Sequence, residues 1–241
     1  MPPSSLASSP SLAQRHALQC LESPSRGLSA LLHASGLAVF AYGYRHLLVT
    51  PNPINDSYGW HMQYLTIIGL SISTASFTCG LLADVTLSPR LFAWKNILSV
   101  ASAPLEVLIS LLYWGLRAID PKLVVPEWAP PLDIIVDWCF HVAPAVALTA
   151  DMLFFSPPST VAALPVIALS STIAFGYWFW IELCFSYNGF YPYPIFELLD
   201  PPSRIVLFAT SALSMALSTW ALQWLYSRVN GSLEAGRTKR E

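Results

Sequence analysis

Charged side chains are scarce in this sequence. Asp, Glu, Lys and Arg together make up 11% of the 241 residues, whereas a soluble domain carries about 25%. Hydrophobic residues reach 54%, which is more apolar surface than a soluble core can hide. The formal net charge is −2, and the only basic run is the short C-terminal group Arg237, Lys239 and Arg240. The composition therefore excludes a soluble domain and argues against a nucleic-acid partner.

Cysteine is also sparse, and its positions show no metal-binding pattern. The four cysteines, Cys20, Cys79, Cys139 and Cys184, form no CxxC pair and have none of the spacings of a zinc site. Three of them fall within apolar segments, where a thiol behaves as a small hydrophobic side chain. We therefore expect neither a metal nor an organic cofactor. No internal repeat is visible, so the sequence does not support the inverted-repeat architecture of secondary transporters.

The sequence does contain a succession of apolar segments of the length that a helix needs to cross a bilayer. About 20 residues rising 1.5 Å each cover roughly 30 Å of hydrocarbon. The six segments, separated by turns rich in proline and charge, are 28–48, 60–83, 91–119, 132–155, 161–185 and 204–226. We predict an all-α, polytopic membrane protein with six transmembrane helices in a single bundle over residues 28–226.

The distribution of Lys and Arg predicts the orientation, because cytosolic loops hold the excess of these residues. With an even number of helices, both tails share one side with the second and fourth loops. Eight of the 12 basic residues fall on that side: Arg15, Arg26, Arg90, Lys95, Arg228, Arg237, Lys239 and Arg240. We therefore predict a disordered cytosolic tail over residues 1–27, unlike a signal peptide, and a cytosolic tail over residues 227–241. The expected host membrane is the endoplasmic reticulum or the plasma membrane.

Polar and ionisable groups inside the apolar segments are the first candidates for function, because burying them in hydrocarbon is costly. They are His33, His61, Thr66, Glu106, Asp137, His141, Asp151 and Glu182. Thr66 lies about 9 Å along the second segment, and His141 lies about 13 Å along the fourth. Both segments enter from the lumenal side, so the two side chains are expected in the same leaflet at similar depth. This placement suits a hydroxyl nucleophile and an imidazole base.

Asp137 precedes His141 by four residues, so the two side chains share a helix face. The carboxylate can orient the imidazole and fix its tautomer, which is the third role of a catalytic triad. The alternative is an interfacial acid near the helix entrance. Likewise, a lone Thr can bond to its own helix backbone and a lone His can pack against a neighbouring helix. Spacing alone therefore leaves the pairing of Thr66 with His141 open.

Three stretches of the sequence carry a family resemblance. They are Tyr58-Gly59-Trp60-His61-Met62-Gln63-Tyr64-Leu65-Thr66, the helix containing His141, and Gly189-Phe190-Tyr191-Pro192-Tyr193-Pro194 followed by Arg204. Together they resemble the family of the androgen-induced protein and the androgen-dependent TFPI-regulating protein. That family consists of multipass membrane hydrolases that use Thr and His, and its proposed nucleophile follows a Trp-x-x-x-Leu-Thr pattern. Here one extra residue separates Trp60 from Leu65, while Leu65-Thr66 still match. The family's His corresponds to His141, with Pro144 three residues later.

The resemblance implies an intramembrane hydrolase of lipid esters, such as fatty acid esters of hydroxy fatty acids. In this interpretation Thr66 is the nucleophile and His141 is the base, and the partners are a lipid ester substrate and membrane lipids. Tyr191, Arg204 and backbone N–H groups near them are candidate substrate contacts or oxyanion donors. Trp178 belongs to an aromatic run that forms either part of the lumenal aromatic belt or the wall of an acyl-chain tunnel.

Two other classes of protein stay open at this point. A transporter or channel could use Glu106, Asp137 and Glu182 as a polar pathway, although the absence of repeats and the scarcity of charge count against it. A lipid-binding or scaffold protein could keep the same fold without turnover.

Overall fold

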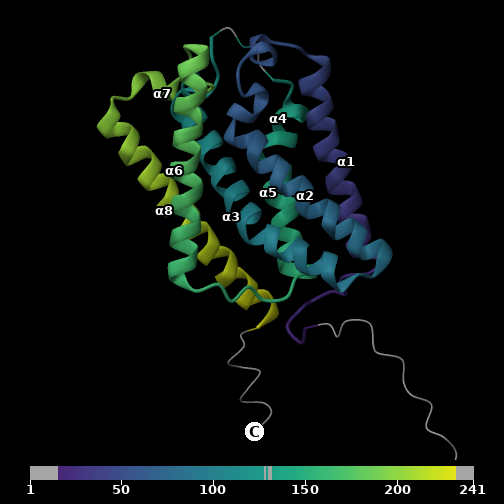
Figure 1. Cartoon of the computed structure of the whole chain (residues 1–241). Helices are drawn as coiled ribbons and strands as arrows, with labels where there is room; N and C mark the ends of the chain where they lie inside the picture. The colour runs from purple at the N-terminus through teal and green to yellow at the C-terminus, as the bar shows by residue number, and fades with distance from the viewer. Residues whose placement is uncertain (1–15, 128, 130–131, 232–241) are drawn as a thin grey trace, which may run out of the picture.

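The computed structural model describes residues 16–127, 129 and 132–231, and these residues form a helical bundle (Figure 1). The α-helices are α1 (Leu28–Val49), α2 (Leu65–Thr86), α3 (Pro89–Ile119), α4 (Ile134–His141), α5 (Ala143–Ala150), α6 (Ala163–Asn188), α7 (Ile195–Leu198) and α8 (Pro201–Asn230). Short 3-10 turns occur at η1 (Pro53–Asp56), η2 (Trp60–Gln63) and η3 (Pro121–Leu123), and a π-helical segment η4 (Asp151–Phe155) follows α5. The predicted all-α class is confirmed for the described part of the chain.

Four helices, α2, α3, α6 and α8, are long and apolar enough to cross a membrane. A fifth span is formed if α4 is joined to α5 and η4, which are bent by 43° at the break. The helix α1 has 22 residues but contains polar side chains such as His33, Arg45 and His46, and it is not among these spans. The chain is therefore a polytopic helical membrane protein with four or five spans of this kind in its described part.

The helices form two groups that meet along α3 (Figure 1). In the first group α2 packs against α1 and α3, and the bent pair of α4 and α5 packs behind them. In the second group α6 and α8 lie side by side, and α8 contacts α3. Two cavities lie in this part of the bundle, one between α3 and the second group and one where α4 approaches α2.

The fourth apolar segment is not one continuous helix, as the sequence led us to expect. Val142 separates α4 from α5 with φ −128° and ψ −53°. Pro144, in the first turn of α5, has no N–H with which to close a helical hydrogen bond to the carbonyl group of Phe140. The break leaves His141 as the last residue of α4.

The start of α2 also differs from the prediction. The second segment was expected to be helical from Trp60, but α2 begins at Leu65. Gly59 adopts a left-handed φ of 85°, and a Cβ at this position would lie 2.8 Å from the Sγ atom of Cys184. Only glycine accepts that conformation and that close approach without strain. As a result, Thr66 lies in the first turn of α2 and not 9 Å inside the helix.

Residues 16–27, which the sequence analysis assigned to a cytosolic tail, lie across one end of the bundle. There the hydroxyl group of Tyr226, near the end of α8, donates a hydrogen bond of 3.0 Å to the carbonyl group of Leu18. The two ends of the described chain therefore lie at the same end of the bundle. Residues 1–15 and 232–241, to which the predicted tails also extend, lie outside the described residues.

Candidate active site

Thr66 is the second residue of α2, so it lies among backbone N–H groups that have no partner within the helix. Its side chain is mostly buried, and its Oγ1 atom lies 3.3 Å from the hydroxyl oxygen of Tyr193. The backbone N–H groups of Leu65 and Thr66 also interact with that tyrosine oxygen and favour negative charge on it. The oxygen therefore occupies a position at the positive end of the helix dipole, where developing negative charge is stabilised. Burial raises the pKa of Tyr193, so its hydroxyl group keeps the proton at neutral pH.

His141 is held by the acid that shares its helix face. Its Nδ1 atom lies 2.9 Å from Oδ1 of Asp137, four residues earlier in α4. Its ring stacks on Tyr113 of α3, with ring centroids 3.4 Å apart and planes 3° from parallel. Since Nδ1 is engaged by the carboxylate, Nε2 is the nitrogen available as an acceptor. The structure thus places Asp137 where an orienting residue must be, and the catalytic role of the pair stays a prediction.

The carboxylate of Asp137 is itself held by a cation near the end of the third predicted segment. Arg117, in the last turn of α3, donates from Nη1 to Oδ2 of Asp137 and, at 2.6 Å, to the hydroxyl oxygen of Tyr113. Asp137 is buried while Arg117 is partly exposed. This ion pair favours the ionised carboxylate, which in turn keeps the Nδ1–H tautomer of His141. Arg117 therefore holds Asp137 in place, and Asp137 in turn holds His141.

Thr66 and His141 line the same cavity, which has a volume of about 370 Å³. No hydrogen bond joins them among the described contacts, because the Thr66 hydroxyl group faces Tyr193. The same cavity is lined by polar groups from the loop after α1 and from η2, including Asn52 and His61. Thr66 and His141 therefore line one cavity, and their pairing as nucleophile and base stays a prediction.

A second cavity, of about 90 Å³, adjoins the first on the side of α6 and α8. Its walls are almost entirely aliphatic and aromatic side chains from α3, α6, α7 and α8. Four residues line both cavities: Thr66, Tyr113, Val124 and Tyr193. Thr66 thus lies at the junction of a larger, partly polar cavity and a narrow apolar one.

His61 adds no positive charge to the larger cavity. Burial, together with the nearby His46, lowers the pKa of His61 to about 4. The imidazole is therefore neutral at physiological pH, and its Nε2 atom lies 3.4 Å from the side-chain oxygen of Asn55. His61 is a neutral polar residue in the wall of the cavity.

The three residues predicted to contact substrate, Tyr191, Arg204 and Trp178, gather around Glu182. The hydroxyl group of Tyr191 and the indole N–H of Trp178 donate to the Glu182 carboxylate at 2.8 and 2.9 Å. Arg204 donates to the same carboxylate at 3.0 Å and to the Tyr191 oxygen at 2.6 Å. None of the four lines either cavity described above. Their contact with substrate stays a prediction, and their observed role is to tie α6, the loop before α7 and the start of α8 together.

Three residues of the site were not singled out from the sequence: Tyr193, Tyr113 and Arg117. Tyr193 lies in the motif 189–194 that carried the resemblance, but nothing in the spacing distinguishes it from Tyr191. Tyr113 and Arg117 are four residues apart on α3 and could have been read as a helical pair that reaches an acid on another helix.

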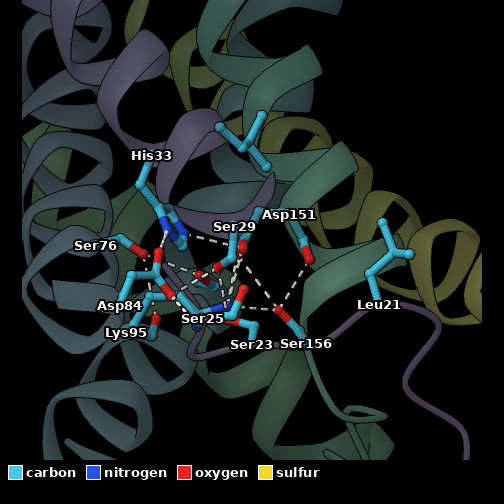
Figure 2. A network of polar contacts seen from close by, with 12 residues as sticks. Leu21, Ser23, Ser25, Ser29, His33, Ser76, Asp84, Lys95, Asp151 and Ser156 are labelled. Atoms are coloured by element: carbon cyan, nitrogen blue, oxygen red, sulfur yellow. Dashed lines mark hydrogen bonds and ion pairs between the residues drawn. The ribbon is translucent and has the colours of Figure 1, made fainter. Parts of the chain in front are cut away.

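A separate cluster of buried charges lies at the other end of the bundle (Figure 2). The ring of His33 lies between two carboxylates, with Nδ1 at 2.7 Å from Asp84 and Nε2 at 3.1 Å from Asp151. Lys95 donates to both oxygens of Asp151, at 2.9 and 3.0 Å, and all four side chains are fully buried. Gly80 makes room for the ring, since a Cβ there would lie 2.5 Å from His33 Nε2.

The hydrogen-bond chemistry of this cluster fixes its charges. An ionised carboxylate only accepts hydrogen bonds, so both nitrogens of His33 must donate and the ring is an imidazolium. Two cations and two anions then balance, which is what allows them to be buried. Lys95, which the sequence analysis assigned to a cytosolic loop, lies inside this cluster. The cluster joins α1, α2, α3 and η4, and we interpret it as structural.

The fold and the site together define a class of protein: a polytopic helical membrane protein with Thr, His and Tyr side chains on a cavity inside the bundle. Residues 28–227 match the family described as FAR-17a/AIG1-like protein, and the chain belongs to this family. A UPF0641 membrane protein of Schizosaccharomyces pombe is 34% identical over 193 residues, which cover 79% of this chain and 86% of that protein. The androgen-induced gene 1 protein of Homo sapiens is 23% identical over 183 residues, covering 68% and 75%. No solved structure matches the chain. The family resemblance seen in the sequence is confirmed.

Proposed function

We propose that this protein is an intramembrane hydrolase of lipid esters, with Thr66 as the nucleophile and His141 as the base. The observation that carries the proposal is the placement of both side chains on one cavity, with His141 fixed by Asp137 and Thr66 at a helix N-terminus. Nucleophile, base and orienting acid are the three roles of a hydrolytic triad. The proposed substrates are fatty acid esters of hydroxy fatty acids or similar branched esters.

The two adjoining cavities support a substrate with two unlike arms. The narrow apolar cavity suits an acyl chain, since its walls offer almost no polar atoms. The larger cavity carries His61, Asn52 and Thr50 and suits the arm with a polar end. An ester carbon placed at the junction lies beside Thr66, which lines both cavities.

The proposed reaction proceeds through an acyl-enzyme. The Oγ1 atom of Thr66 attacks the ester carbonyl carbon as its proton passes to Nε2 of His141. Collapse of the tetrahedral intermediate breaks the bond to the alcohol oxygen, which takes the proton from His141. Water then attacks the acyl-enzyme with the same histidine as base, and the fatty acid leaves. In this proposal, backbone N–H groups at the start of α2 and the hydroxyl group of Tyr193, which lie beside Thr66, stabilise the oxyanion.

Turnover by the purified protein is the direct test of this function. The full chain in detergent micelles or nanodiscs is incubated with a branched ester of a hydroxy fatty acid, and the released fatty acid is measured by mass spectrometry. We expect release that scales with protein concentration and stops after heat denaturation. A well-folded preparation that releases no fatty acid from branched or simple lipid esters contradicts the proposal and favours a lipid-binding or scaffold protein.

Replacement of Tyr193 by Phe tests the oxyanion role of its hydroxyl group. Loss of one oxyanion donor lowers kcat by about 10²-fold while the ring packing is kept. We expect that loss in kcat with little change in KM. The matched control is Tyr64→Phe, because the Tyr64 ring packs edge-on against Tyr193 and lines the same cavity. Equal kcat values for the two variants contradict the role proposed for Tyr193.

The transporter alternative receives no support from the contacts. Glu106 accepts a hydrogen bond from Ser73 at 2.9 Å, Asp137 pairs with Arg117 and His141, and Glu182 pairs with Arg204. Among the described residues, the three acids thus belong to three separate groups and do not line one path.

We further propose six crossings with both termini in the cytosol, in the endoplasmic reticulum or the plasma membrane. Residues 16–27 and the C-terminal end of α8 lie at the same end of the bundle, which supports an even number of crossings. The 22 residues of α1 cover about 33 Å as a helix, so its length suffices for a sixth crossing beside the bent pair.

Reporters of membrane sidedness test this topology. A reporter fused after Glu241 and one inserted at residues 157–159 are both expected to read cytosolic, and one inserted at residues 121–123 is expected to read lumenal. The loop after η4 and the chain end lie on the same side only if α6 and α8 are two successive crossings. Opposite readings for the first two reporters contradict the proposed topology.

A further inference from the structure

A third cavity, of about 250 Å³, lies far along α3 from the candidate active site. It is enclosed by the first half of α3, by the chain that follows η4, and by the second half of α8. Thr66 and His141 do not line it, so the proposed hydrolysis gives it no role.

One wall of this cavity carries a buried hydrogen-bond acceptor that lacks a donor. The side-chain oxygen of Asn96 is buried and has no hydrogen-bond partner. One turn later, the carbonyl group of Val100 cannot receive the regular helical hydrogen bond, because its donor position is Pro104, which has no N–H. Asn96, Val100 and Pro104 are spaced by four residues, share one face of α3, and all line the cavity. A buried acceptor without a donor is costly, so a ligand that donates hydrogen bonds is favoured here.

The lining also limits the charge of that ligand. The polar side chains that line the cavity are Asn96, Ser99, Ser156, Ser159, Thr160, Thr219 and Gln223, and none of them is ionisable. The nearby ammonium group of Lys95 is saturated by Asp151 and Ser156. A charged headgroup would therefore enter without a counter-charge, which is unfavourable away from water. The cavity suits a neutral group with hydroxyl donors.

The position of the cavity indicates where the ligand comes from. Ile97 lines its mouth and is 58% exposed on α3, a helix long and apolar enough to span a membrane. The exposed face of such a helix contacts lipid chains. A volume of 250 Å³ corresponds to roughly eight water molecules. It can hold a glycerol-sized headgroup, while an attached chain leaves past Ile97 into the bilayer.

We propose that this cavity binds a neutral, hydroxyl-bearing glycerolipid, such as an acylglycerol or alkylglycerol, whose hydroxyl group donates to Asn96. The site is independent of the proposed hydrolysis, because it shares none of its lining residues with the Thr66 cavity. Binding satisfies an acceptor that the folded protein leaves without a partner.

Photolabelling of the full chain in phosphatidylcholine nanodiscs tests the proposal. The probe is a glycerol monoalkyl ether with a diazirine near the headgroup, and the ether bond prevents turnover. Its counterpart has both free hydroxyl groups methylated. We expect adducts on residues 152–161 or 219–223. Labelling by the probe with free hydroxyl groups is expected to be about fivefold stronger than labelling by the methylated probe, which is the effect of one hydrogen bond.

The variant Asn96→Leu tests the hydrogen-bond acceptor separately from the shape of the cavity, because Leu is similar in shape to Asn but cannot accept a hydrogen bond. It removes a buried polar group without a partner, so the protein is expected to fold at least as well, as thermal unfolding can verify. Labelling by the two probes is expected to become equal in this variant. Trp94→Leu is the control, since Trp94 lies on the same helix, is 58% exposed and does not line the cavity.

Several outcomes overturn the proposal. Equal labelling of the wild-type protein by both probes removes the hydroxyl recognition, and a preference that survives in Asn96→Leu removes the assigned acceptor. Adducts spread over the lipid-facing side of α6 show a non-specific bilayer contact. Displacement of the probe by phosphatidic acid, but not by dioleoylglycerol, shows that the cavity takes an anionic lipid.

Discussion

Replacement of Thr66 by Val is expected to lower kcat/KM for a branched fatty acid ester by about 10⁴-fold or more, because it removes the nucleophile and keeps the shape of the side chain. His141→Ala is expected to lose a similar factor. The double variant is expected to be little worse than either single variant, because a nucleophile and its base act as one unit. The measurement is steady-state hydrolysis by purified variants that elute as folded protein.

The controls for this prediction lie on the same helix. Thr74→Val makes the same chemical change two turns further along α2, where the Thr74 hydroxyl group bonds only to the carbonyl group of Leu70, and it is expected to leave hydrolysis unchanged. Thr66→Ser keeps a hydroxyl group and is expected to keep part of the activity. Both Val variants are expected to fold, since a hydroxyl group in a membrane helix contributes about 0.6 kcal/mol. Undiminished hydrolysis by Thr66→Val contradicts the nucleophile assignment.

Replacement of Lys95 by Met is expected to lower the free energy of unfolding by about 3 to 5 kcal/mol, because it leaves Asp151 buried beside one cation instead of two. The cluster then holds one cation, His33, and two anions, Asp84 and Asp151, so one buried negative charge is not balanced. The measurement is thermal or denaturant-induced unfolding of the purified variant in detergent.

Two variants make this prediction specific to buried charge. Lys95→Met combined with Asp151→Asn removes one cation and one anion, so it is expected to be more stable than Lys95→Met alone. Lys122→Met also breaks a lysine–carboxylate pair, but Lys122 and Glu127 are both exposed, and no measurable change is expected. A Lys95→Met variant as stable as the Lys122→Met variant shows that the cluster is not a charge-balanced structural unit.

Much of the bundle could be predicted from the sequence, because the length of the apolar segments and the thickness of the bilayer together determine where spanning helices occur. Prolines between the predicted segments, such as Pro51, Pro89 and Pro157, fall outside the observed α-helices or at a helix start. The fourth segment was the exception. Pro144 lies inside an uninterrupted apolar run, and hydropathy alone does not show that the chain breaks there.

The candidate site was located by depth, and the structure corrects the expected position of Thr66 along its helix. Thr66 does face the cavity that His141 lines, but it belongs to the first turn of α2. The length of the apolar segment did not reveal this, because it does not show that residues 60–63 form a 3-10 turn and that Tyr64 is extended before α2 begins. The helix start matters for the proposed mechanism, in which its backbone N–H groups stabilise the oxyanion.

Residues that meet across the bundle could not be predicted. Tyr193 reaches Thr66 from a loop 127 positions away, and His33 reaches Asp151 over 118 positions. No local pattern encodes such contacts. The sequence shows that Asp84 and Lys95 are charged residues close to helix ends. Such charges are expected to lie in water or at the membrane interface, so their burial could not be predicted.

The most direct test of the account is the identity of the residue that reacts. Purified protein is incubated with a fluorophosphonate probe, which labels activated hydroxyl nucleophiles, and the modified residue is located by mass spectrometry. We predict an adduct on Thr66 in the folded wild-type protein and its loss in His141→Ala. An adduct on Ser170 or Ser211, which also line the apolar cavity, or turnover without any adduct on Thr66, contradicts it.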